Sequence, residues 1–343
     1  MDSGWDGSSM KIAIVGPGAI GSLFAGMLGL GGHEVWLLDR HPDRVRLISR
    51  RGIWISGVTG EFNSHVHVTA NVDEVGTAGL VLIAVKSYDT EQAARSAEPM
   101  MGPESVALSL QNGLGNLETL VDVFGEQRVI GGVTSQGATL IAPGQVRHAG
   151  QGATTIGELN WALAPEAGVR REPQGGTVPA PRRAAGQLTQ RLREIAGVFT
   201  ASGIQTELTA DLQSVLWGKL AVNAGVNAVA TLAQVRNGGI LESRYLRELM
   251  RAAVGETVEV AKAKSIELPE ADMESYAEGV CQRTADNVNS MLQDVRRQRR
   301  TEIDAINGAV VREGEGADVP TPTNLVLASL IRGIEGTYAA RVA

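Results

Sequence analysis

The sequence feature that most restricts the fold is a glycine motif near the N-terminus. Gly16-Pro-Gly-Ala-Ile-Gly21 directly follows the short apolar run Lys11–Val15. Residues 22–30 then have the composition of an apolar helix, and residues 33–39 that of a second strand. Strand, glycine turn, helix and strand within about thirty residues form the fingerprint of a dinucleotide-binding fold.

Each glycine of the motif has its own expected role. Gly16 allows a tight turn, Gly18 lets a pyrophosphate approach the backbone, and Gly21 lets the helix pack closely on the sheet. Ala19 and Ile20 belong to the same turn, directly before the predicted helix, whose N-terminus offers N–H groups and the positive end of the helix dipole to the phosphates. The sequence therefore predicts a cofactor site at this turn.

The second predicted strand ends in Asp39 and Arg40. An acidic residue at this position normally accepts hydrogen bonds from the adenosine ribose, which favours NAD, whereas an arginine favours the 2′-phosphate of NADP. This chain has both residues, so its local pattern is compatible with either cofactor.

Two further predicted strands end in polar side chains. Residues 80–85 form an apolar run followed by Lys86, and residues 105–110 form another, followed closely by Asn112. Ligands of open α/β sheets bind at the carboxyl ends of the strands. We therefore expect Lys86 and Asn112 at the edge of the nucleotide site rather than on a solvated loop.

The remaining pattern divides the chain into an N-terminal β-α part and a helical part. Residues 53–56 and 62–69 look like a hairpin, and residues 128–157 like strands that extend the sheet in antiparallel fashion. The chain beyond about residue 209 reads as helical.

The predicted fold is an α/β Rossmann-type domain followed by an all-α domain. The predicted boundaries are a flexible tail over 1–9, the dinucleotide-binding domain over 10–208 with a long loop at 161–185, and the helical domain over 209–343. Its predicted helices span 211–233, 240–265, 270–293 continuing to about 311, and 321–335.

The first predicted helix of the C-terminal part carries a polar stripe. Lys219, Asn223 and Asn227 stand at i, i+4 and i+8 in an otherwise apolar helix. One interpretation is a solvated face; the other is a pocket for an anionic, oxygen-rich small molecule, which an ammonium and two carboxamides suit.

A basic run lies later in this part, from Arg296 to Arg300. We interpret it as the solvated face of a helix, with Asp294 and Glu302 as i,i+4 partners of the arginines.

Composition excludes several function classes. The formal net charge of −7 argues against a general binder of nucleic acid or anionic membranes. The single cysteine, Cys281, rules out an intrachain disulfide and a cysteine-based zinc site. No metal-ligand cluster, signal peptide or apolar run of about 20 residues is evident, so we expect a cytoplasmic protein without a metal.

Several motifs in order carry a resemblance to a known family. They are GPGAIG at 16–21, VKSYDT around Lys86, QNGLGN around Asn112, KLAVNAGVN from Lys219, and SMLQDVRRQRRTEIDAINGAVV from Ser290. Together, over nearly the whole chain from residue 11, they resemble the ketopantoate reductases (2-dehydropantoate 2-reductases). The resemblance implies a Rossmann domain and a helical domain with the site in the cleft between them.

The resemblance also implies roles for individual residues. Lys219 corresponds to the general acid that protonates the keto oxygen, and Glu302 to a carboxylate that binds the substrate hydroxyl. Lys86 and Asn112 match positions at the nicotinamide end of the cofactor. The residues that match substrate-contacting positions are Asn223, Asn227, Asn237 and Ser290.

The implied activity is NAD(P)H-dependent reduction of a 2-keto acid, foremost 2-dehydropantoate to pantoate, with NADP as the family default and NAD open because of Asp39. One alternative is a D-2-hydroxyacid dehydrogenase of the same family that acts on another branched or aromatic 2-keto acid. A second is a non-catalytic dinucleotide sensor on the same scaffold. The sequence is compatible with a monomer or a homodimer.

Overall fold

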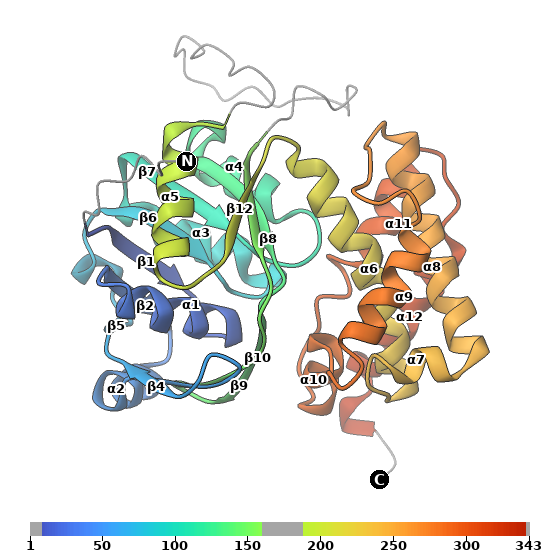
Figure 1. Cartoon of the computed structure of the whole chain (residues 1–343), viewed down its shortest axis with the longest axis horizontal. Coiled ribbons are helices and arrows are strands. Elements are labelled where there is room, and N and C mark those ends of the chain that lie inside the picture. Colours follow the sequence, from blue (N-terminus) through green and yellow to red (C-terminus); the bar gives the residue numbers. More distant parts are fainter. Residues whose placement is uncertain (1–8, 160–187, 341–343) are drawn as a thin grey trace.

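The computed structural model describes residues 9–159 and 188–340 and divides into a sheet domain and a helical domain (Figure 1). In Figure 1 the sheet domain lies at the left and the helical domain at the right, with α6 on the side of the helical domain that faces the sheet. The predicted loop at 161–185 and nearly all of the predicted tail lie outside the described residues.

The larger sheet has the strand order of a dinucleotide-binding fold. In the described part of the chain it runs β12-β11-β8-β7-β6-β1-β2-β5, parallel from β8 to β5, with β11 antiparallel to β8. Its strands are β1 (Lys11–Val15), β2 (Glu34–Leu38), β5 (His67–Thr69), β6 (Ala78–Ile83), β7 (Met101–Ser109), β8 (Val129–Thr134), β11 (Thr154–Glu158) and β12 (Thr206–Thr209). The order reverses between β1 and β6, and ligands bind at such switch points, outside the carboxyl ends of the strands.

Helices cover both faces of this sheet. Alternate residues of β1 point to opposite faces, so Ile12 and Ile14 pack in a core with α1 and α5, whereas Ala13 and Val15 pack in a core with α3 and α4. The helices of this domain are α1 (Ala19–Leu30), α2 (Pro42–Arg51), α3 (Thr90–Ala97), α4 (Asn116–Phe124) and α5 (Gln190–Ala201). Because both faces are buried, the central strands read as continuous apolar runs, the pattern that predicted them.

A smaller sheet, with strand order β4-β3-β10-β9, corrects two details of the prediction. Its strands are β3 (Ile53–Gly57), β4 (Phe62–Ser64), β9 (Gly137–Ala142) and β10 (Gln145–Gly150). The hairpin of β3 and β4 is confirmed, but its second strand ends at Ser64, and β5 instead joins the larger sheet parallel to β2. The 128–157 region does not simply extend the sheet, since β8 is parallel to β7 and the β9–β10 hairpin lies in the smaller sheet. Alternation along a strand predicts its buried face but not its partner.

The helical domain packs around α6 as its central helix. Its helices are α6 (Leu212–Ala233), α7 (Gly239–Glu242), α8 (Arg244–Ala263), α9 (Met273–Arg283), α10 (Ser290–Arg296), α11 (Asn307–Gly316) and α12 (Pro322–Gly336). Asp211 caps the N-terminus of α6 by accepting from the Ser214 N–H, and Gln234 ends the helix in the left-handed conformation.

The predicted continuous helices at 240–265 and 270–311 are wrong, because each is interrupted. Ser243 starts α8 as an N-cap, and Asn289 starts α10 by accepting from the Leu292 N–H. Residues 297–306 leave the helical path between α10 and α11. Short polar side chains satisfy free N–H groups at a new helix start, so they permit these breaks without loss of hydrogen bonding.

Among the described residues, α6 alone is long and apolar enough to cross a membrane by length and composition. Most of its apolar window, 72%, is buried inside the protein, as in the core helix of a globular domain.

Candidate functional site

The glycine turn after β1 has the shape of a phosphate-binding cradle. Gly16 has φ +110°, and a Cβ there would lie 2.8 Å from the Val85 nitrogen. A Cβ on Gly21 would lie 2.0 Å from the Gly16 carbonyl oxygen, so α1 packs directly on the turn. At Gly18 the nearest atom is 3.8 Å away, which leaves open space in front of the backbone.

The helix that follows this turn starts without a side-chain cap. Gly18 is the N-cap of α1, and the half-buried Ala19 and Ile20 are its first residues. Uncapped N–H groups and a helix dipole beside open space suit an anionic ligand, so the residues present fit a dinucleotide pyrophosphate.

Asp39 and Arg40 at the end of β2 have different environments. The Asp39 side chain is fully buried, where its Oδ1 accepts from the His41 N–H at 3.0 Å and from the Arg44 guanidinium at 2.5 Å. The Arg40 side chain is 65% exposed, with Asp89 4.0 Å away. The Asp39 carboxylate is therefore paired with Arg44 inside the protein, and Arg40 is the group that a ligand can reach.

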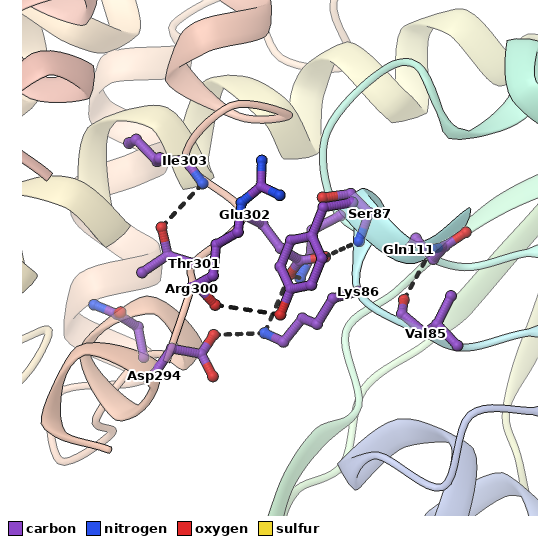
Figure 2. Close-up of polar contacts among 12 residues, drawn as sticks. Val85, Lys86, Ser87, Gln111, Asp294, Arg300, Thr301, Glu302 and Ile303 are labelled. Carbon is purple, nitrogen blue, oxygen red and sulfur yellow. Dashed lines mark hydrogen bonds and ion pairs between the residues drawn. The ribbon is translucent and has the colours of Figure 1, made fainter. Parts of the chain in front are cut away.

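An ion-pair cluster joins the two domains (Figure 2). Lys86, which follows β6, donates from Nζ to Asp294 Oδ2 at 2.6 Å and lies 3.4 Å from Glu302 Oε2. Glu302 also accepts from the Ser87 N–H at 3.1 Å and from Asn112 Nδ2 at 3.3 Å. Lys86, Ser87 and Asn112 belong to the sheet domain, while Asp294 and Glu302 come from the helical domain. We name these five residues the interdomain cluster.

The backbone beside this cluster is also in contact across the domains. The Leu114 N–H donates to the Ala305 carbonyl at 2.9 Å. Gly113 has φ +79°, and a Cβ there would lie 2.1 Å from the same carbonyl oxygen. Only glycine fits this approach, which holds Asn112 against Glu302.

The charges of the cluster set the protonation of Lys86. Burial alone would lower the pKa of Lys86, but the neighbouring carboxylates of Glu302 and Asp294 raise it above its usual value. Burial raises the pKa of Asp294, and Lys86 opposes that rise. Lys86 is therefore a permanent cation in this site.

Lys219 of α6 has a different environment. Its Nζ donates to the Thr134 main-chain carbonyl, at the end of β8, at 3.0 Å. Burial lowers the pKa of Lys219 to about 8, while the charge of Glu302 acts in the opposite direction. A lysine with this pKa is charged at neutral pH yet can release its proton, which makes it suited to general acid catalysis.

The predicted substrate-contacting residues lie along α6 and on the segment that leads into α10. Asn223 is half-buried one turn beyond Lys219, and Asn227 is buried. The main-chain carbonyl of Asn227 lies 3.5 Å from Nδ2 of Asn289, the residue before the exposed Ser290.

Asn237 follows α6 and is buried. Its Nδ2 donates to Thr284 Oγ1 at 2.9 Å, and its N–H donates to the Asn287 carbonyl at 3.1 Å. Its Oδ1 has no partner among the described residues. The structure therefore ties Asn237 to the segment that precedes Ser290, and leaves one buried acceptor on this residue unsatisfied.

Residues 296–300 are exposed, as expected for a solvated basic run, but they do not form the face of a helix. Helix α10 ends at Arg296, and Asp294 and Glu302 pair with Lys86 instead of with the arginines. Arg297 donates to the Leu140 carbonyl of the sheet domain, and the Arg300 guanidinium lies 4.7 Å from the Tyr88 ring. The segment bridges the domains because its partners lie in the other domain, where the local i,i+4 rule does not apply.

Sequence reasoning missed Asp294 as a member of the site. One signal was present: Asp294 stands four residues after Ser290, so both lie on the same face of α10.

Comparison with known proteins places the chain in a family. The model described as "Ketopantoate reductase PanE/ApbA" matches residues 12–161, and its C-terminal counterpart matches residues 211–335. The chain belongs to the ketopantoate reductase family. It is 35% identical to a 2-dehydropantoate 2-reductase of Pyrococcus abyssi, over 95% of this chain and 98% of the relative.

Solved structures agree with this assignment. A PanE/ApbA family ketopantoate reductase from Ralstonia eutropha JMP134 has a TM-score of 0.81 and 30% identity, covering 96% of this chain and 99% of that one. D-mandelate dehydrogenase in complex with NADH has a TM-score of 0.79 and 25% identity, covering 96% and 99%. The predicted family, fold class and oxidoreductase activity are thus confirmed.

Proposed function

We propose that this protein uses NADPH to reduce 2-dehydropantoate to pantoate. The observation that carries the proposal is a lysine with a lowered pKa, Lys219, whose charge is coupled to the buried carboxylate of Glu302 between the domains. Reduction of a ketone needs a hydride on carbon and a proton on oxygen, and Lys219 supplies the proton. Relatives in the family carry the name of this reaction.

The residues of this chain prepare the keto group for reaction. Reduced nicotinamide, when bound, supplies the hydride. The Lys219 ammonium donates a hydrogen bond to the keto oxygen, stabilises the charge that develops there, and then transfers its proton to give the hydroxyl. Neutral Lys219 regains a proton from water. The Thr134 carbonyl accepts from Nζ and limits the directions in which this ammonium can point.

The remaining side chains bind and orient the two ligands. The amides of Asn223, Asn227 and Asn237 and the hydroxyl of Ser290 are suited to the carboxylate and hydroxyl oxygens of the substrate, because they add no charge. Glu302 accepts from the substrate hydroxyl, and Lys86 and Asn112 lie at the nicotinamide end of the cofactor. The glycine turn and the start of α1 hold the pyrophosphate.

The environments of Asp39 and Arg40 favour NADPH over NADH. Asp39 is buried against Arg44, so its carboxylate neither repels a 2′-phosphate strongly nor reaches the ribose hydroxyls. The Arg40 side chain is exposed and has only long contacts, with His41 and Asp89, so its guanidinium can pair with the 2′-phosphate.

Steady-state oxidation of NADPH and NADH, each with 2-dehydropantoate and a panel of other 2-keto acids, tests the proposal. We expect the highest kcat/KM with NADPH and 2-dehydropantoate. A higher kcat/KM with an aromatic 2-keto acid would instead assign the chain to a D-2-hydroxyacid dehydrogenase. Tight cofactor binding without turnover of any acid would leave only a dinucleotide sensor.

Arg40→Ala tests the cofactor choice separately. Loss of one charge-assisted pair with the 2′-phosphate should raise the KM for NADPH about tenfold and leave that for NADH unchanged. Arg46→Ala, a change to an exposed arginine on α2 paired with Asp43, serves as the control. An equal loss with both cofactors in Arg40→Ala would remove Arg40 from phosphate recognition.

A further inference from the structure

Asp294 is the closest partner of Lys86, although it is not among the residues that the family resemblance implies. The Asp294 side chain is 10% exposed, and its Oδ2 lies 2.6 Å from Lys86 Nζ, compared with 3.4 Å for Glu302 Oε2. Figure 2 shows Lys86 extending from the sheet domain toward Asp294, with Glu302 beside it. Asp294 therefore makes the shorter contact with Lys86, and the charges of both carboxylates act on this lysine.

Asp294 is itself held rigidly. It lies on α10 between the buried residues Leu292 and Val295, and the Asn289 side chain caps this helix. A carboxylate on a packed helix is a fixed partner for a long, flexible lysine side chain, so Asp294 determines where the Lys86 ammonium lies.

The position of Lys86 determines what remains available on Glu302. With Lys86 closer to Asp294, Glu302 keeps only a long contact of 3.4 Å with Lys86, accepts from Ser87 and Asn112, and has a negative charge that still acts on Lys219. A Lys86 that paired closely with Glu302 would neutralise that charge and occupy the carboxylate.

We propose that Asp294 is a positioning residue for the reduction: it holds the Lys86 ammonium at the cofactor edge and prevents a closer pairing of Lys86 with Glu302, whose carboxylate serves the substrate and Lys219. This inference rests on the proposed function. The charged and titratable groups around Asp294 and Lys86 are Glu302 from the loop before α11, Tyr88 after β6, and Arg299 after α10.

Asp294→Asn is the direct test, because the amide keeps the shape and removes the charge. Lys86 then pairs more closely with Glu302. This pairing reduces the effect of the Glu302 charge on the pKa of Lys219. We expect kcat/KM to fall about ten- to a hundredfold, as for a misplaced catalytic group. In a plot of kcat/KM against pH, activity should fall at alkaline pH as Lys219 loses its proton. We expect this alkaline limb to move to lower pH by about half a unit or more in Asp294→Asn.

Asp304→Asn is the matched control. Asp304 lies in the same domain and pairs with Arg300 and Arg332, but its side chain is 43% exposed and lies outside the interdomain cluster. Its variant should keep the wild-type alkaline limb. Equal alkaline limbs in Asp294→Asn and Asp304→Asn would overturn the proposal.

A double-mutant cycle tests whether Asp294 acts through Lys86. In a Lys86→Met background there is no ammonium to redirect, so Asp294→Asn should produce no further shift of the alkaline limb. A shift of the same size in both backgrounds would contradict the proposal. If Lys86→Met does not fold, the comparison of Asp294→Asn with Asp304→Asn still decides the result.

A readout independent of turnover separates this inference from the proposed function. The rate at which an amine-reactive reagent modifies Lys219, followed by peptide mass spectrometry from about pH 6 to about pH 11, reports the pKa of Lys219. A lower pKa in Asp294→Asn than in wild type supports the coupling of Asp294 to Lys219 even in a protein that reduces no 2-keto acid. An unchanged pKa contradicts the coupling, whichever substrate the wild-type protein uses.

Discussion

Two lysines reach the region between the domains, and their surroundings differ. Lys86 of the sheet domain lies against two carboxylates, Asp294 and Glu302. Lys219 of the helical domain is half-buried and donates to a neutral main-chain carbonyl. The pKa of Lys86 is therefore raised and that of Lys219 is lowered to about 8.

This contrast assigns different chemistry to identical side chains. Lys86 keeps its charge and is suited to binding and orientation, whereas Lys219 can give up a proton at an accessible pH. Opposite pKa shifts distinguish Lys86, which stays charged, from Lys219, which can act as an acid. Such a pattern is typical of catalytic sites. Glu302 links the two lysines, because its charge acts on both.

Lys219→Ala should give the largest effect. Loss of the general acid should lower kcat/KM by about 10²–10⁴-fold, because the alkoxide then takes its proton from water. The Kd for NADPH, measured by fluorescence titration, should stay within about threefold of wild type, since Lys219 lies in the helical domain.

Lys264→Ala provides the control for this variant. Lys264 lies in the same domain and pairs with Glu313 at 2.6 Å, outside the interdomain cluster. Its kcat/KM should match wild type. Unchanged turnover in Lys219→Ala would remove Lys219 from the mechanism.

The pH dependence should show which lysine is the acid. Because the reduction needs protonated Lys219, kcat/KM should be constant below about pH 8 and fall up to tenfold per pH unit above it. Lys86→Met should keep an alkaline limb, whereas Lys219→Ala should lose it. If the alkaline limb were lost in Lys86→Met and kept in Lys219→Ala, Lys86 would be the acid instead of Lys219.

The smallest effect should come from removing the hydrogen bond that supports the strand end at Thr134, whose carbonyl accepts from Lys219. Thr134 Oγ1 and Thr154 Oγ1 are buried and 2.9 Å apart, and this hydrogen bond fixes the strand end that holds Lys219. Thr154→Val should lower the free energy of unfolding by about 1 kcal/mol and kcat/KM about threefold.

Thr257→Val in α8 is the matched control for Thr154→Val. Thr257 is equally buried and donates to the Ala253 carbonyl within its own helix. Its stability should fall by a similar amount while kcat/KM stays at the wild-type value. Equal losses of kcat/KM in the two variants would show that Thr154 acts only through stability.

Elements with strong local signals could be predicted from the sequence. Helix α2 (Pro42–Arg51) starts at a proline and is followed by a glycine, two residues that mark helix ends in a sequence. Strand Lys11–Val15 and the glycine turn also formed as expected, because each rests on an apolar run or on a residue type that the backbone requires.

Features that depend on distant residues were missed. The partner of Asp294 is 208 positions away in the sequence, so a local reading assigned the carboxylate to neighbouring arginines. In the same way, β5 pairs with β2 instead of continuing the β4 hairpin strand. Pairing across domains or sheets depends on the assembled fold, and helix or strand periodicity carries no signal for it.

The contact of Gly113 with the Ala305 backbone has a consequence for protein engineering. Residues 86–88 and 112–114 of one domain contact 294–305 of the other, and at Gly113 there is no space for a side chain. A chimera that takes its helical domain from a relative, to accept a different keto acid, must exchange these sheet-domain residues as well. The segment to exchange in such a chimera is therefore larger than the helical domain. It also includes the residues that follow the carboxyl ends of β6 and β7.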